Sequence, residues 1–230
     1  ALLLSFFVFL LSGIILAGCF GSMSNEGEAG PEDIYLDYKI WGEEGEDSVM
    51  VMLQFREYDA YGTTVRIDGP GSVTLDGKRI PADSSVMTGP YYAVTRQVKE
   101  FTGWHTIVFT SADKVKHKEE FYFRPFTLKT QLTDSLKRDR LNLQFEGLEK
   151  RDIVRVLLTD TSIAGDGINR LDTIWNNKLT LTKNTLSYLE NGPVHLELIK
   201  EIEKPVENHT GAGGTIIVLY TIRREFFLLD

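Results

Sequence analysis

The feature that most limits the fold of this chain is an alternation of apolar and polar residues with a period of two, repeated in short segments. It is clearest at residues 34–40 and 49–55, where every second residue is apolar. Such a pattern is typical of strands with one buried face. Asp76-Gly77 predicts a tight hairpin between two of the segments, because Asp-Gly accepts the positive φ of a type I′ turn. Further strands are predicted at 91–98, 104–110, 116–123, 127–132, 141–145, 153–159, 172–175, 178–182, 194–199 and 215–222, the last running towards 228.

The even spacing of these strands, without a convincing long helix, predicts an all-β chain. We expect two tandem antiparallel β-sandwiches of the immunoglobulin or fibronectin type III kind. Residues 33–125 would form the first module and residues 126–230 the second. The linker between them, Arg124-Pro125-Phe126, is short enough to give a stiff elbow. Each module is expected to fold on its own.

The segment between Thr182 and Gly192 predicts a helical turn before a strand. Thr182 can cap its start, Leu186 and Leu189 lie three residues apart, and Gly192 can end it. This pattern resembles the E–F corner of fibronectin type III and immunoglobulin-like domains. Aligning Gly103 with Gly192 superposes two alternating strands, which supports two similar modules and predicts that His105 points inward.

An uncharged apolar run from Ala1 to Gly18 leads into Leu16-Ala17-Gly18-Cys19. This sequence resembles the lipobox of bacterial lipoproteins. The resemblance implies cleavage between Gly18 and Cys19, with a diacylglyceryl group on the Cys19 thiol and a further acyl chain, such as palmitate, on the new amino terminus. Residues 1–18 would then be a signal peptide whose basic N-terminal region is missing. An uncleaved helical anchor is the alternative, since eighteen residues reach the lower limit for a membrane span.

Residues 19–32 are rich in Gly, Ser, Asn and Glu and predict a flexible tether behind the lipidated cysteine. The rest of the chain resembles two-domain immunoglobulin-like lipoproteins of the Bacteroidetes group. The residues that carry this likeness are 147–154, 186–193 and 220–226. The resemblance implies a lipid anchor in the cell envelope, at the outer membrane, and leaves the periplasmic or surface face open.

Composition excludes several classes of function. The net charge of -8 argues against nucleic acid, whose phosphates need a basic patch. Cys19 is the only cysteine, so disulfides and thiolate metal sites are excluded from the folded part. The four histidines, His105, His117, His195 and His209, lack metal-ligand spacing. We therefore predict no catalytic residue, metal or cofactor.

Four aromatic residues are the candidates for a ligand platform, because sugars stack on aromatic planes: Trp41, Tyr92, Trp104 and Trp175. Trp41 has an alternative place, at the seam between the two modules, which we favour. Ser48, Ser135 and Thr173 lie in tripeptides that resemble O-glycosylation sites of the Bacteroidetes group.

Three functions remain open. The leading hypothesis is a membrane-anchored, non-enzymatic binding, adhesion or structural module whose partner is an envelope protein or a glycan. The first alternative is a glycan-binding accessory lipoprotein of a nutrient-uptake system, which needs an exposed aromatic platform. The second is a hydrolase, which needs titratable groups gathered in a pocket.

Overall fold

The computed structural model describes Gly30, residues 33–161 and residues 167–230. The predicted signal peptide, the predicted lipidation site Cys19 and most of the predicted tether lie outside these residues. Within the described part of the chain, no helix is both long enough and apolar enough to cross a membrane.

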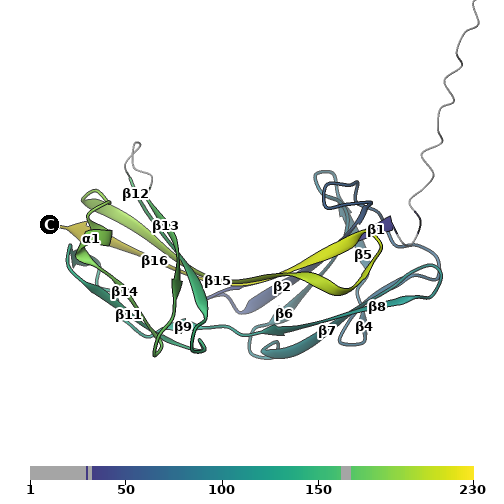
Figure 1. The fold of residues 1–230 in the computed structure, drawn as a ribbon, viewed down its shortest axis with the longest axis horizontal. Helices are drawn as coiled ribbons and strands as arrows, with labels where there is room; N and C mark the ends of the chain where they lie inside the picture. Colours follow the sequence, from purple (N-terminus) through teal and green to yellow (C-terminus); the bar gives the residue numbers. More distant parts are fainter. Residues whose placement is uncertain (1–29, 31–32, 162–166) are drawn as a thin grey trace, which may run out of the picture.

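The described chain consists of strands and one short helix, arranged in two lobes (Figure 1). Lobe 1 contains β1 (Ile34–Glu43), β2 (Ser48–Glu57), β3 (Ser72–Leu75), β4 (Lys78–Arg79), β5 (Ala82–Ser85), β6 (Gly89–Gln97), β7 (Gly103–Thr110) and β8 (Lys116–Phe123). Lobe 2 contains β9 (Thr127–Leu128), β10 (Ser135–Lys137), β11 (Leu141–Glu146), β12 (Ile153–Asp160), β13 (Ile168–Thr173), β14 (Lys178–Leu181) and α1 (Lys183–Leu186). The last two strands, β15 (Gly192–Thr210) and β16 (Gly213–Leu229), run through both lobes.

One large sheet joins the two lobes. Its nine strands follow the order β13-β12-β15-β16-β1-β2-β6-β5, with β10 also paired to β16. Two small sheets complete the sandwiches: β4-β3-β7-β8 in lobe 1 and β14-β11-β9 in lobe 2. The described residues therefore form two β-sandwiches that share one sheet, and the predicted all-β sandwich class is confirmed.

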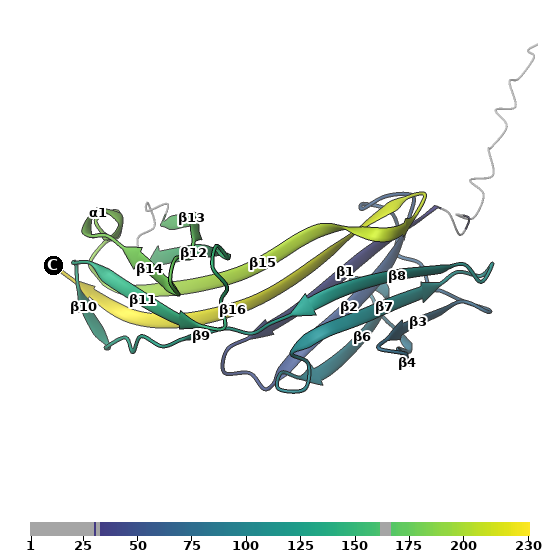
Figure 2. The same ribbon diagram turned by 60° about the horizontal axis from the view of Figure 1, so that its bottom comes forward.

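The β15–β16 hairpin makes this connection (Figure 2). In lobe 2, β15 pairs with β12 through residues 194–199, and the end of β16 pairs with β10. In lobe 1, residues 214–221 of β16 pair in parallel with residues 36–43 of β1. The hydrogen bonding of lobe 1 thus includes a segment from the end of the chain. The predicted boundary at Pro125 does not separate the strand pairing of the two halves, and whether each half folds alone stays a prediction.

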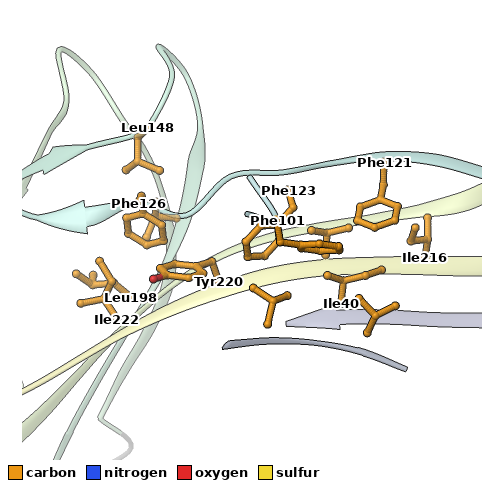
Figure 3. Packing of buried hydrophobic residues seen from close by; sticks show 14 of the residues in the cluster. Ile40, Phe101, Phe121, Phe123, Phe126, Leu148, Leu198, Ile216, Tyr220 and Ile222 are labelled. Atoms are coloured by element: carbon orange, nitrogen blue, oxygen red, sulfur yellow. The ribbon is translucent and has the colours of Figure 1, made fainter. Parts of the chain in front are cut away.

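The core is continuous across the junction. Ile216, Val218, Tyr220 and Ile222 alternate along β16 with their side chains buried on one face. At the junction the Tyr220 ring lies 6.0 Å from Phe123 and 5.7 Å from Phe126, between centroids (Figure 3). These rings therefore form the seam between the lobes.

Two local predictions are confirmed in detail. Asp76 and Gly77 have φ of 50° and 75°, as a type I′ hairpin requires. The Thr182 hydroxyl accepts a hydrogen bond from the Thr185 amide at the start of α1, and Leu189 is buried behind the turn. The aligned glycines Gly103 and Gly192, with φ of 131° and 135°, each begin a strand, β7 in a small sheet and β15 in the large sheet.

Candidate functional site: a groove between strands β8 and β15

The strongest candidate site lies where the small sheet of lobe 1 ends. Strand β8 is the last strand of that sheet, and it faces residues 200–209 of β15, which β12 no longer covers. Three neighbouring hollows follow this line, with volumes of about 30, 190 and 460 Å³. Tyr122 and Ile202 line the first two, and Glu120 lines the last two, so the hollows form one β8–β15 groove.

The central hollow has an apolar floor and an aromatic wall. Ile216 and Val218 of β16 contribute to the floor together with Ile202 of β15, which is 45% exposed. Ile202 is left exposed because the small sheet stops at β8 and does not extend over it. Trp104 and Tyr122 form the wall.

Trp104 packs against Tyr122, which is in turn in contact with Arg124. Its ring lies 5.3 Å from that of Tyr122, with the two planes tilted by 59°. The Arg124 guanidinium lies 5.2 Å from the centre of the Tyr122 ring and pairs with Glu149 at 2.5 Å. Trp104 nevertheless remains 73% exposed, so one indole surface is open to a ligand.

A buried carboxylate ties β8 to β15 beside the central hollow. Glu119 is 1% exposed; its Oε1 lies 2.8 Å from Lys204 Nζ and its Oε2 accepts the Glu207 amide at 2.7 Å. Burial lowers the pKa of Lys204, but the hydrogen bonds to Glu119 and Glu207 outweigh it and raise the pKa above its ordinary value. The lysine is therefore a cation whose charge is already balanced, which does not favour an anionic ligand.

Two buried polar side chains lie behind the groove without hydrogen-bond partners among the described residues, Tyr38 and His117. Burial raises the pKa of Tyr38, and the Glu119 carboxylate raises it further, so the phenol stays neutral. The His117 ring stacks on Phe109 with centroids 5.4 Å apart. Both side chains are enclosed in the core of lobe 1, which makes them structural groups.

The two strand edges at the groove are poorly suited to pairing with another strand. Lys204 Nζ donates to the Glu120 carbonyl at 3.4 Å, so that carbonyl already has a partner. Pro205 removes one amide from the edge of β15. Charged residues and proline on an edge oppose strand addition. The groove is therefore built to recognise a ligand through side chains, with an indole face and the polar Glu120, Asn208 and His209 along its length.

The structure does not bring the four predicted platform residues together. Tyr92 is 4% exposed because its ring packs at 5.4 Å from Phe55 and its hydroxyl bonds to Ile67. Trp175, 52% exposed, lies in lobe 2 beneath Arg151. Trp41 is on the outer face of the large sheet, 36% exposed, so its favoured place at the seam was wrong. Of the four, only Trp104 lines the groove.

The histidines and the proposed glycan acceptors have clear positions. His105 is buried, with Nδ1 at 2.8 Å from Asp76 and Nε2 at 2.7 Å from the Phe101 carbonyl, which confirms an inward, hydrogen-bonded residue. His195 is exposed beside Glu225. No metal-binding cluster of His, Cys, Asp and Glu occurs among the described residues. The predicted acceptors are all exposed at strand ends, and their modification stays a prediction: Ser48, Ser135 and Thr173.

What sequence reasoning missed is the other wall of the groove. Residues 200–206 carry several charges and a proline, a composition that is typical of a loop. In the structure they nevertheless continue strand β15. One signal in the sequence could have indicated this: the apolar residues Ile202 and Val206 continue the even-numbered alternation of Leu196 and Leu198. Strand β8 was predicted, but not that it would end its sheet.

No protein-family model and no curated protein matches this sequence. Solved structures do match. A crystal structure of DIP-gamma IG1+IG2 is 7% identical and covers 85% of this chain and 95% of its own, with a TM-score of 0.25. A 1.5-MDa bacterial ice-binding adhesin (11% identity, 87% of this chain and 65% of its own) and the Yersinia pseudotuberculosis adhesin InvE (13%, 85% and 61%) have the same TM-score. Likeness at this level supports no inference about a ligand, and the fold class rests on the strand pairing.

Proposed function

We propose that this chain is an envelope-anchored, non-enzymatic binding module, and that the β8–β15 groove holds a carbohydrate chain. The observation that carries the proposal is Trp104, whose indole is 73% exposed above an open groove. Sugars offer apolar faces that stack on such rings and hydroxyl groups that hydrogen-bond at their edges. An apolar surface with a few placed polar groups is the usual composition of a ligand site.

The charges of the groove support a neutral ligand. Lys204 is paired with Glu119 and Glu207, and Arg124 is paired with Glu149. Because these cations are already balanced, they offer little to a phosphate or a sulfate. Glu120, Asn208 and His209 are polar side chains in reach of hydroxyl groups.

Trp104→Ala should weaken glycan binding at least tenfold, because it removes the stacking surface. The test applies the mature chain, with Cys19→Ser to prevent lipidation, to a glycan array and then measures the bound sugars by calorimetry. Trp175→Ala is the matched control, since Trp175 is also an exposed tryptophan but lies in lobe 2, outside the groove. Equal affinity in the Trp104 variant, or an array on which the wild-type chain binds nothing, would contradict the proposal.

The geometry of the molecule suits an anchor at the start of the chain. Strand β1 begins beside the β15–β16 turn, where the Thr210 hydroxyl bonds to the Ile34 carbonyl. The C-terminus lies at the opposite pole (Figure 1). A strand of the 19 residues in β15 spans roughly 60 Å at about 3.3 Å per residue. A lipid on Cys19 would therefore hold lobe 1 near the membrane and lobe 2 away from it.

Cys19→Ala should abolish incorporation of a clickable fatty acid and release the chain from membranes, because the thiol is the acceptor of the lipid. One acyl chain binds only marginally, whereas two or three on one cysteine anchor stably. The measurement is in-gel fluorescence after metabolic labelling, with Ser24→Ala as a control in the same tether. Label retained in the Cys19 variant would rule out lipidation at this residue.

A further inference from the structure

The large sheet has one face that the described chain leaves uncovered. Both small sheets pack on the same side, since the even-numbered residues of β16 are buried in lobe 1 and again in lobe 2. The odd-numbered side chains of β1, β12, β15 and β16 point the other way, to an outer face shared by both lobes. A sheet face of this kind is normally hydrophilic unless another element packs on it.

This outer face carries apolar side chains in register on adjacent strands. Leu219 of β16 lies opposite Trp41 of β1, which lies opposite Met50 of β2. Ile217 and Met52 flank Lys39 in the next row. In lobe 2 the same face presents Ile199, Ile153 and Leu171, the last two 53% and 60% exposed. Soluble monomers rarely expose contiguous apolar patches larger than a few hundred Å².

On the lobe 1 part of this face the charges left without an ion pair are acidic, whereas in lobe 2 Arg155 and Lys137 point outward without a carboxylate partner among the described residues. Glu203 lies opposite Ile217 and Glu201 opposite Leu219, and both carboxylates are exposed without an ion pair among the described residues. The other acids of the face have polar or basic partners: Asp83 accepts a hydrogen bond from the Tyr91 hydroxyl, and Glu225 lies beside His195. Asp37 pairs with Lys39 and Arg56, while Glu43 and Glu197 share Arg223. Two free carboxylates thus lie beside the apolar residues of lobe 1.

We propose that the outer face is a docking surface for a partner protein that presents basic side chains beside an apolar strip. Complementary charge steers such a partner and fixes its register, while the apolar strip contributes the buried area. A second copy fits less well, because a two-fold axis that runs along β1 through Trp41 lays Glu201 over Thr95 and Glu203 over Ala93 of β6, which carry no charge. An anionic lipid surface is disfavoured by the same two carboxylates.

The test uses a fluorescent 18-residue amphipathic peptide of leucine and lysine as the probe and the mature chain with Cys19→Ser as the receptor. Glu201→Gln/Glu203→Gln should weaken binding at least tenfold, measured by fluorescence anisotropy. Asp134→Asn/Glu190→Gln, which removes two exposed, unpaired acids outside this face, should leave binding unchanged. Trp41→Thr should weaken binding, whereas Trp104→Thr in the groove should not.

Two results would overturn this proposal. One is that both double variants weaken peptide binding equally, which would mean that binding depends only on the net charge of the chain. The other is a concentration-dependent dimer in sedimentation that Trp41→Thr abolishes, which would assign the face to a second copy. Neither bears on glycan binding in the groove, because none of the four residues 41, 201, 203 and 217 lines it.

Discussion

Expressed alone, residues 33–125 should remain unfolded. Their strand β1 would lose its parallel partner, residues 214–221 of β16. Leu36, Tyr38 and Ile40 would then lack the packing of Ile216, Val218 and Tyr220. Burying one such side chain contributes about 1.5–3 kcal/mol. Three of them approach the whole stability of a small domain, about 5–15 kcal/mol. The measurement is NMR amide dispersion together with urea denaturation.

The matched control joins residues 33–125 to residues 200–221 through a short Gly/Ser linker. Arg124 and Lys200 line the same hollow, so a short linker reaches. This chimera restores the missing strand and should give a dispersed spectrum and a cooperative transition. Equal stability of the fragment and the chimera would show that lobe 1 does not depend on residues 200–221. That result would support the independent modules expected from the sequence.

Phe126→Ala should destabilise the whole chain by about 3–5 kcal/mol, the usual cost of truncating a buried phenylalanine. Phe126 is 1% exposed and packs against Tyr220 of the shared hairpin and Phe145 of lobe 2. The packing lost in the variant is therefore at the seam between the two lobes. Urea denaturation should show the same shift in probes of both lobes, the fluorescence of Trp104 and of Trp175. Tyr188→Ala, at an exposed aromatic residue, is the control and should change little.

The outcome of that experiment shows whether the two lobes unfold together or separately. A shift seen only by the lobe 2 probe would mean that the lobes unfold separately, and that the shared strands do not couple them. A shift below 1 kcal/mol in both probes would mean that Phe126 is not a core residue. Phe126→Leu should fall between the alanine variant and the wild type, because it keeps part of the buried volume.

The sequence predicted the local structure of this chain well and its connectivity poorly. Alternation located most strands because one face of each is buried, and the turn at Asp76-Gly77 followed from the conformations these residues allow. Strand pairing depends on contacts between distant segments, and period-two patterns do not encode which strands pair. The pairing of β1 with β16, about 180 residues apart, is of this kind.

The candidate site was predictable only in part, for the same reason. Trp104 was named as a possible contact because sugars stack on aromatic planes, but the opposite wall of the groove was not predicted. Ile202 contributes to the groove only because β15 extends beyond β12 and past the edge of β8. Tyr92 was misjudged because its hydroxyl is satisfied by the backbone of Ile67, which permits burial. An alternating pattern shows that the two faces of a strand differ, but it does not show which face another sheet covers.

The central claim is that β1 and β16 are neighbours in one sheet that crosses both lobes, and a cysteine pair tests it most directly. Lys39 and Ile217 face each other across these strands. Adjacent strands lie about 4.8 Å apart, within the Cα separation that a disulfide accepts. In a Cys19→Ser background, Lys39→Cys/Ile217→Cys should cross-link quickly on mild oxidation, as mass spectrometry of the digested chain would show. Lys39→Cys/Glu203→Cys, one strand further away, should not. No cross-link in the first pair, or equal cross-linking in both, would contradict the shared sheet.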